Sequence, residues 1–266
     1  MNTQELSFEV ADGVGRLTLN RPEARNALTL EVIDGLRRAA TQAAGDPAIR
    51  ALLITGTDRA FCAGADVKRM MTPEVLVGRT PREAALDTTD VLHRMVTALY
   101  RLPKPVICAV NGAAAGAGLA LAMIGDVVWA SASATFRAAY TAIGLSPDGG
   151  STFLLPRVVG PRLAAELMLT NRTLTAEDAH GIGLVSRVLP DGELLPAAEE
   201  LARQLAGGAT QAFAELKALL RATPRSDLET QLEDERQAVA RAVGTADFAE
   251  GVMAFIQKRP PNFSGR

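Results

Sequence analysis

Alternating hydrophobic positions near the start of the chain predict a pair of β-strands. Residues 6–10 alternate between apolar and polar side chains, and Asp12-Gly13 is a strong turn signal. The period of two continues at Leu17 and Leu19, and Asn20-Arg-Pro22 breaks the second strand. We therefore expect an antiparallel hairpin at the N-terminus.

Helical periodicity and short apolar runs alternate in the next part of the chain. Thr29 is the expected N-cap of a helix that ends near Ala44, and residues 84–102 have the pattern of a second, longer helix. Residues 73–80 have the composition of a loop. Apolar runs of strand length occur at 51–55, 106–110 and 127–130, and a shorter helix is expected at 116–123.

The hydrophobic pattern after Pro161 is almost wholly helical. Thr175-Ala-Glu-Asp178 has the form of a capping box, with aspartate where glutamate or glutamine is usual. Amphipathic helices are expected at 194–205, 211–222, 228–243 and 246–258. This order predicts an α/β core over residues 1–200, followed by a helical region over residues 201–266.

Composition and charge exclude several classes of protein. Of the 266 residues, 48% are hydrophobic and 22% are charged, which is typical of a globular protein with a sizeable core. The formal net charge of −2 provides no basic field for nucleic acid. Arg21, Arg25, Lys258 and Arg259 are small basic candidates that would suit a phosphorylated small molecule instead.

The cysteines and the N-terminus indicate a cytoplasmic protein. Cys62 and Cys108 are the only cysteines, and each lies in an apolar stretch, so we expect core residues in a reducing compartment rather than a disulfide. The first residues lack the pattern of a signal peptide. Without an uninterrupted apolar run of about 18 residues, no membrane-spanning segment is expected.

Common catalytic motifs are missing from the sequence. His93 and His180 are the only histidines, and neither has a second ligand at metal spacing, so no metal site is expected. Gly116-Ala-Gly118 lacks the third glycine of a dinucleotide-binding motif. There is neither a phosphate-binding loop ending in Gly-Lys-Ser/Thr nor a serine in a nucleophile elbow.

Two segments instead run from a short apolar strand into a turn of small residues. They are Phe61-Cys-Ala-Gly-Ala-Asp66 and Asn111-Gly-Ala-Ala-Ala-Gly-Ala-Gly118. Small side chains let a ligand approach the backbone, and a turn that opens a helix offers free N–H groups at the positive end of the helix dipole. Two converging N–H groups would stabilise an oxyanion. Taken singly, each segment is better explained by tight packing of a strand against a helix.

Together, the two segments resemble the crotonase, or enoyl-CoA hydratase/isomerase, superfamily. The resemblance covers nearly the whole chain, with its motifs in the expected order. The other matching segments are Asn20-Arg-Pro22, Arg25-Asn-Ala-Leu28, Lys104-Pro-Val106, Phe136, Leu155-Pro-Arg-Val-Val-Gly160, Glu166–Thr170, Gly183-Leu-Val185, Glu250–Phe255 and Lys258-Arg259.

The resemblance implies a crotonase-type spiral of ββα units and a helical C-terminal trimerisation region. It also implies a homotrimer or homohexamer that binds an acyl-CoA thioester, with no cofactor beyond the coenzyme A of the substrate. By motif, the backbone N–H groups of Ala65 and Ala117 would hold the thioester oxygen. The residues that would contact CoA are Arg25, Ala27, Ala63 and Asp66, with Phe255 and Lys258 reaching the nucleotide end, often from a neighbouring subunit.

The acidic residues indicate which reaction this resemblance implies. Hydratases of the family hold water between two glutamates, and the matching positions here are Ala120 and Tyr140, which disfavours hydration. Asp148, in Gly144–Ser151, resembles the acid of enoyl-CoA isomerases and 1,2-epoxyphenylacetyl-CoA isomerases. A carboxylate beside an acyl chain can take up a proton and return it. A turn aspartate is the simpler alternative, since Pro-Asp-Gly is itself a turn signal.

Two other functions stay open at this point. Asp148 and His93 also resemble the 4-chlorobenzoyl-CoA dehalogenase branch, in which the aspartate attacks the ring and the histidine assists hydrolysis. That branch has tryptophan where this sequence has Tyr140, which we expect to be a wall of the acyl pocket. Taken alone, His93 is better explained as a solvated or packed helical residue. The second alternative is a non-catalytic crotonase-fold protein that binds CoA esters.

Overall fold

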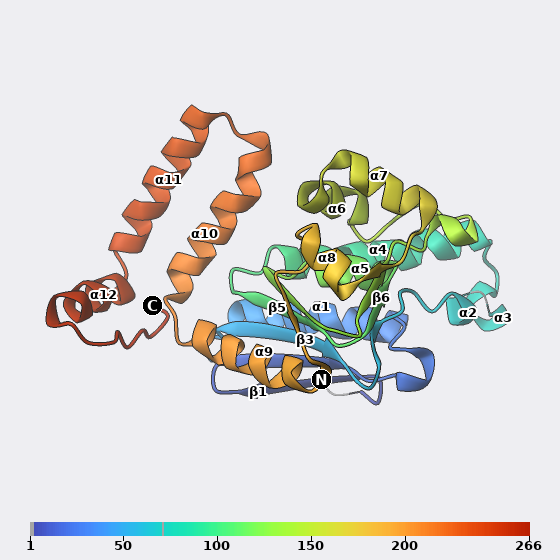
Figure 1. The fold of residues 1–266 in the computed structure, drawn as a ribbon, viewed down its shortest axis with the longest axis horizontal. Helices are drawn as coiled ribbons and strands as arrows, with labels where there is room; N and C mark the ends of the chain where they lie inside the picture. The colour runs from blue at the N-terminus through green and yellow to red at the C-terminus, as the bar shows by residue number, and fades with distance from the viewer. Residues whose placement is uncertain (1–2, 71) are drawn as a thin grey trace.

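The computed structural model describes residues 3–70 and 72–266, apart from the side chains of residues 70, 74 and 75, and its described strands form two sheets (Figure 1). The larger sheet has the order β1 (Leu6–Ala11), β2 (Val14–Leu19), β3 (Ala51–Gly56), β5 (Val106–Val110), β7 (Val127–Ser131) and β10 (Arg187–Leu189). The smaller sheet has the order β4 (Ala60–Cys62), β6 (Ala113–Ala115), β8 (Thr135–Arg137) and β9 (Leu174–Thr175). Pairing is antiparallel for β1–β2 and β8–β9 and parallel elsewhere.

The chain passes between the two sheets in a repeated order. A strand of the larger sheet is followed by a strand of the smaller sheet and then by a helix, as in β3–β4, β5–β6 and β7–β8. The helices that follow are α2 (Val67–Met70), α3 (Pro73–Leu76) and α4 (Pro81–Tyr100), then α5 (Ala117–Met123), and then α6 (Ser151–Val159) after the 3₁₀ turn Thr141–Ile143. This order is the spiral of ββα units that the resemblance implied.

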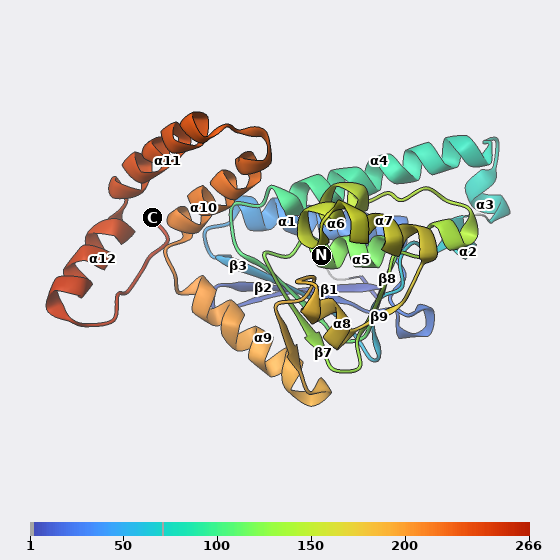
Figure 2. The ribbon, with the colours of Figure 1, turned by 45° about the horizontal axis from the view of Figure 1, so that its top comes forward.

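Helices cover both faces of the larger sheet. α1 (Leu30–Gly45) and α4 pack together on one face, and α9 (Asp191–Ala206) packs on the other (Figure 2). The two faces carry separate hydrophobic clusters, of which the α9 side is lined by Leu194, Ala198 and Ala202. The remaining helices of the core are α7 (Pro161–Thr170), α8 (Ala176–Gly181) and the 3₁₀ turn Pro22–Ala24.

The C-terminal helices form an arm that projects from the core in both views (Figures 1 and 2). They are α10 (Thr210–Ala222), α11 (Leu228–Val243) and α12 (Ala246–Gln257), with a 3₁₀ turn at Thr223–Arg225. The predicted boundary between residues 200 and 201 falls inside α9, which packs on the core as one helix. The turn Gly207-Gly208, between α9 and α10, therefore separates the arm from the core.

Most predicted elements are confirmed, but several expectations are wrong. The two segments expected to be small-residue turns each contain a strand, β4 and β6. The Thr29 hydroxyl caps α1 by accepting a hydrogen bond from Val32 N at 3.2 Å, and Thr175 and Asp178 form the expected capping box. Residues 73–80 were expected to be a loop, but α3 occupies their first half. The chain after Pro161 also contains β9 and β10, which are too short for an alternating pattern to reveal.

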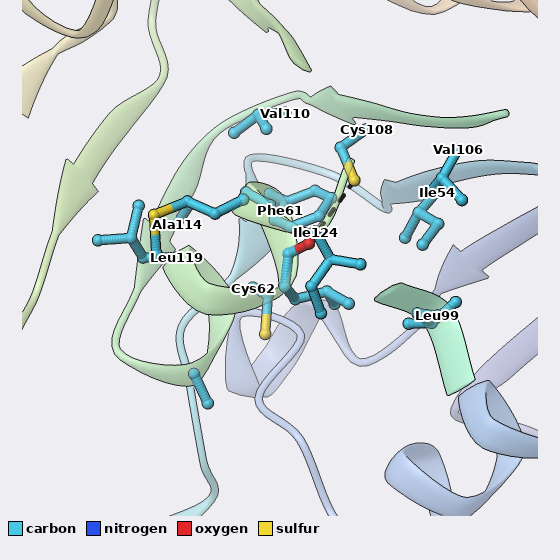
Figure 3. Packing of buried hydrophobic residues seen from close by; sticks show 14 of the residues in the cluster. Ile54, Phe61, Cys62, Leu99, Val106, Cys108, Val110, Ala114, Leu119 and Ile124 are labelled. Carbon is cyan, nitrogen blue, oxygen red and sulfur yellow. Dashed lines mark hydrogen bonds between the residues drawn. The ribbon is translucent and has the colours of Figure 1, made fainter. Parts of the chain in front are cut away.

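The core beside the two small-residue turns is closely packed (Figure 3). Phe61, Val110 and Leu119 lie in this cluster with Cys62 and Cys108. Both cysteines are free and fully buried, and burial raises the pKa of each thiol to about 12. This confirms the expectation of core cysteines.

Gly118 allows α5 to pack against β4 at backbone distance. A Cβ added at Gly118 would lie 2.0 Å from the carbonyl oxygen of Cys62, so the two backbones would have to separate. We expect Gly118→Ala to lower the free energy of unfolding by about 3 kcal/mol, at the upper end of the usual cost of overpacking. Thermal or denaturant unfolding measures this effect.

Gly45→Ala is the matched control for Gly118. Gly45 ends α1, and an added Cβ would meet no atom within 4 Å. Alanine there is expected to be neutral or to stabilise the helix by up to about 1 kcal/mol. Equal stability of the two variants would show that the contact between α5 and β4 does not constrain the fold.

Candidate active site

The two small-residue turns lie directly against each other. Gly64 has φ +99° and Gly116 has φ +52°, conformations that other residues rarely adopt. A Cβ added at Gly64 would lie 2.8 Å from the carbonyl oxygen of Ala115. On its other side, the first turn pairs with Leu28, whose amide donates to Gly64 O at 2.7 Å and whose carbonyl accepts from Asp66 N at 3.0 Å. The packing of the two turns therefore requires glycine at position 64.

This arrangement leaves two amides free within residues 3–70 and 72–266. Neither Ala65 N nor Ala117 N donates a hydrogen bond there, and both residues line the same cavity. The amide nitrogen of Ala117 lies close to the first turn: a Cβ added at Gly64 would be 3.5 Å from it. Ala117 also begins α5, so its N–H lies at the positive end of a helix dipole. These donors are suited to binding an oxyanion.

The cavity beside the two amides is large and mostly apolar. Its volume is about 1080 Å³, and it extends from the start of α5 along α4 to the segment 143–152. Among the described lining residues, Asp148 is the only carboxylate and His93 the only other ionisable side chain. The two free amides thus border a cavity that has one carboxylic acid among its described lining residues.

Asp148 is held through its backbone carbonyl, and the Tyr140 hydroxyl also interacts with its side chain, so that one carboxylate oxygen, Oδ1, is left without a partner among the described residues. Its carbonyl oxygen accepts hydrogen bonds from Ser151 N at 3.0 Å, Ser151 Oγ at 2.7 Å and Tyr140 Oη at 3.3 Å. Gly149 and Gly150 follow with φ values of +60° and +79° and lead into α6. Asp148 Oδ1 is buried and has no partner in the described part of the chain. An orphaned buried oxygen at a cavity wall is a common feature of functional sites.

Tyr140 has a different place from the one expected. It is buried and is absent from the described lining of the cavity, and its hydroxyl contacts the Asp148 turn instead. Burial raises the pKa of Tyr140, and the neighbouring Asp148 charge raises it further, so the hydroxyl stays protonated. We therefore revise its expected role from a wall of the acyl pocket to a support of this turn. Ala120 lies behind the same turn, its Cβ 3.2 Å from the Cβ position of Gly149.

His93 lies on the exposed side of α4 and lines the cavity that contains Asp148. Its ring has no hydrogen bond within the described chain. The structure thus brings His93 into the same space as Asp148, Ala65 and Ala117.

The loop that precedes α1 supports the first turn. Ala63 N donates to Arg25 O at 3.0 Å, and Ala27 O accepts from Arg21 Nη1 at 2.8 Å. Arg21 also forms ion pairs with Asp66 at 3.0 Å and with Glu5 at 3.1 Å. Burial alone would raise the pKa of Asp66, but the Arg69 amide and the Arg21 guanidinium outweigh it and lower that pKa.

These contacts correct part of the expectation about basic residues. Arg21 forms an ion pair with Asp66 within the fold, and Arg259 forms an ion pair with Glu250 at 2.6 Å, so both charges are already paired. Arg25 borders a separate hollow of about 380 Å³, together with Glu23 and Arg59. Of the four basic candidates, Arg25 and Lys258 have no ion pair within the described chain.

Asn26 is a residue whose role the sequence did not reveal. Its side chain is 1% exposed, and it accepts from Arg21 N at 2.8 Å and donates to Ala60 O at 2.7 Å. Since Asn26 has φ +58°, asparagine suits the position both by conformation and by hydrogen bonding. The signal in the sequence was its place in the segment Arg25-Asn-Ala-Leu28, which matches the family but does not reveal these hydrogen bonds.

Phe255 and Lys258 lie at the end of α12, at the far end of the arm from the cavity of the same chain (Figures 1 and 2). The Phe255 side chain is 85% exposed. A single chain therefore does not bring these residues to the site.

No group of three or more His, Cys, Asp or Glu side chains in the described residues is arranged to hold a metal ion. In the same residues, no helix is both long enough and apolar enough to span a bilayer.

A spiral of ββα units that places two free amides beside an apolar cavity defines the crotonase class of proteins. The chain belongs to the enoyl-CoA hydratase/isomerase family, which it matches over residues 9–266. Members of this family act on acyl-CoA thioesters.

Relatives with different names share nearly the whole chain. A 1,2-epoxyphenylacetyl-CoA isomerase of Escherichia coli is 43% identical over 258 residues, covering 97% of each chain. A protein of Rhodobacter capsulatus named "Probable enoyl-CoA hydratase" is 38% identical, covering all of both chains. The crystal structure of an enoyl-CoA hydratase from a Polaromonas species has a TM-score of 0.90 at 36% identity, covering 97% of this chain and 99% of that one. The family is thus established. Because the relatives are named for different reactions, the reaction of this chain has to be inferred from the residues of the site.

Proposed function

We propose that this enzyme isomerises an unsaturated or ring-derived acyl-CoA, with Asp148 as the group that moves the proton. The observation that carries the proposal is the buried, unpartnered Oδ1 of Asp148 at the wall of the cavity. No second carboxylate is found among the described lining residues, and by motif resemblance Ala120 and Tyr140 match the positions of the two hydratase acids. One acid suits the removal and return of a single proton.

The proposed reaction is a proton transfer through an enolate. Asp148 takes a proton from a carbon adjacent to, or vinylogous with, the thioester carbonyl, and the C–H electron pair moves into the conjugated system. The negative charge that develops on the thioester oxygen accepts hydrogen bonds from Ala65 N and Ala117 N. Asp148 then returns the proton to another carbon of the acyl group. The product is an isomer of the substrate, and the carboxylate is regenerated.

The rest of the CoA site is proposed from the loops around the first turn. Arg25, Ala27, Ala63 and Asp66 would line the CoA, as the packing of residues 25–28 against 63–66 supports. Asp66 would do so while paired with Arg21.

Phe255 and Lys258 would reach the nucleotide end of CoA from a neighbouring subunit of a homotrimer or homohexamer. The many exposed apolar residues of the arm support assembly through residues 201–266. They are Leu216, Leu220, Leu228, Leu232, Val239, Val243, Phe248, Val252, Met253, Phe255 and Ile256.

Dehalogenation of an aryl-CoA is the second candidate, because His93 and Asp148 line one cavity. In that reaction Asp148 would attack the ring carbon and expel halide, and water assisted by His93 would release the product. The two candidates differ in product: one yields an isomer, the other halide and a hydroxylated acyl group.

The test is a panel of CoA thioesters with identification of each product by mass spectrometry and NMR. The panel contains 3-enoyl-CoA, 2-enoyl-CoA, 1,2-epoxyphenylacetyl-CoA and 4-chlorobenzoyl-CoA. We expect an isomer of equal mass from the first or third substrate. Halide release from the fourth would replace the proposal by dehalogenation, and water addition to the second would replace it by hydration. Tight binding of all four without turnover would indicate a non-catalytic protein.

A further inference from the structure

The face of α4 that borders the cavity carries a stripe of polar residues. Thr89, His93 and Thr97 are spaced four residues apart, so they lie one above another on the helix, and all three line the cavity. Their neighbours Leu92 and Val96 form the apolar part of the same face. The stripe is unexpected in a wall that would hold a hydrocarbon chain.

The stripe reaches the level of Asp148. A Cβ added at Gly149 would lie 3.7 Å from Leu92 Cδ2, and one added at Gly150 would lie 3.5 Å from Val96 Cγ1. The turn that carries Asp148 therefore packs on the part of α4 that holds His93 and Thr97. Thr152 lines the cavity from the start of α6, two residues beyond Gly150.

Three of these polar groups are available to a ligand. The Thr89 hydroxyl already donates to Ala85 O of its own helix at 2.7 Å. The side chains of His93, Thr97 and Thr152 have no hydrogen bond in the described part of the chain. All three side chains are exposed, and a purely hydrocarbon acyl group that packed against them would displace water without replacing its hydrogen bonds, which is unfavourable.

The charged side chains near Asp148 limit which acyl groups this end of the cavity can bind. No arginine or lysine is found among its described lining residues, while Asp148 contributes a carboxylate that has no ion pair in the described part of the chain. A second carboxylate, on the acyl group, would be repelled by Asp148 without a cation to balance it. The site therefore suits a neutral oxygen better than an acid.

We propose that Thr97, Thr152 and His93 form a subsite that binds a neutral oxygen atom of the acyl group, such as an ether, epoxide or carbonyl oxygen. The inference rests on the proposed function in taking the Asp148 cavity as the acyl site. It narrows the substrate class to acyl-CoA thioesters that carry an uncharged oxygen function near the reacting carbons.

Calorimetric titration of the wild-type protein with saturated thioesters tests the subsite without any turnover. Cyclohexylacetyl-CoA is compared with the 2-, 3- and 4-tetrahydropyranyl analogues, which replace one ring CH₂ by an ether oxygen. We expect at least one analogue to bind roughly three- to tenfold more tightly than the hydrocarbon, as one or two net hydrogen bonds would give. Hexanoyl-CoA is expected to bind more tightly than adipyl-CoA, which has a second carboxylate.

Variants of the threonines test whether the tighter binding of the ether analogues comes from the proposed subsite. Thr97→Val and Thr152→Val keep the shape of the side chain and should reduce the preference, and the double variant should abolish it, because cyclohexylacetyl-CoA no longer leaves two hydroxyl groups unpaired. Thr89→Val is the matched control, since the Thr89 hydroxyl is already used by its own helix.

Equal binding of all four ring compounds, tighter binding of adipyl-CoA than of hexanoyl-CoA, or a preference that survives in the double variant would overturn the inference. Proton transfer by Asp148 is tested separately by turnover. Failure of the subsite leaves that proposal standing, and an oxygen preference in a protein without isomerase activity would contradict only the proposed reaction.

Discussion

Replacing Asp148 by asparagine is expected to lower the isomerisation rate by roughly 10²–10⁴-fold, the usual contribution of a positioned acid–base group. Asparagine keeps the size of the side chain and the backbone contacts that Asp148 O makes with Ser151 and Tyr140. Only the ability to accept and return a proton is lost. The effect should therefore fall on kcat, with KM for the acyl-CoA changed little. Steady-state kinetics on a 3-enoyl-CoA measures it.

Asp12→Asn is the matched control for this substitution. Asp12 is exposed in the β1–β2 turn at φ +51°, a conformation that asparagine tolerates, and it lies outside the cavity. Its kinetics should equal those of the wild type. Turnover of the Asp148→Asn enzyme at the wild-type rate would remove Asp148 from the mechanism and leave it as a turn residue.

Ala117→Pro is expected to lower kcat by about 10²–10³-fold, as loss of one oxyanion donor typically does. Proline has no backbone N–H, so it removes the donor itself and not merely a side chain. The helix should persist, because Ala117 is the first residue of α5, a position that proline favours. Gly116 precedes it with φ +52° and ψ −124°, outside the α region that a following proline disfavours.

A proline at the start of another helix controls for the effect of the substitution on folding. Ala246 is exposed and begins α12, and Thr245 caps that helix by accepting from Phe248 N at 3.0 Å. Ala246→Pro should leave both kcat and the melting temperature near the wild-type values. If Ala117→Pro keeps its melting temperature and retains full activity, the Ala117 amide does not stabilise the reaction.

Most strands and helices could be predicted because they are determined by residues that lie close together in the sequence. The alternation over residues 6–19 and the capping residues Thr29 and Thr175 act within a few positions of the chain, so the sequence contains them. α11 was predicted at its observed bounds, Leu228–Val243. The strands β9 and β10 were missed because two or three residues show no period, and they form only by pairing with β8 and β7.

The candidate site was predicted less completely because its geometry depends on contacts between distant segments. The resemblance indicated Asp148, Ala65 and Ala117, and the structure places all three around one cavity. It could not show that Tyr140 supports the Asp148 turn from behind, since this depends on how residues 140–151 fold back on themselves. Nor could it show that Arg21 forms ion pairs with Asp66 and Glu5, which lie 45 and 16 residues away along the chain.

Transfer of an isotopic label tests the central claim, that one carboxylate moves one proton between two carbons of a bound thioester. A 3-enoyl-CoA carrying deuterium at C2 is incubated with the enzyme in ordinary water, and the position of the label in the product is determined by NMR. Our account predicts a 2-enoyl-CoA with deuterium at C4, produced by the wild type and by Asp12→Asn but not by Asp148→Asn. A product that has gained the elements of water, or a wild-type product with no label at C4, would contradict it.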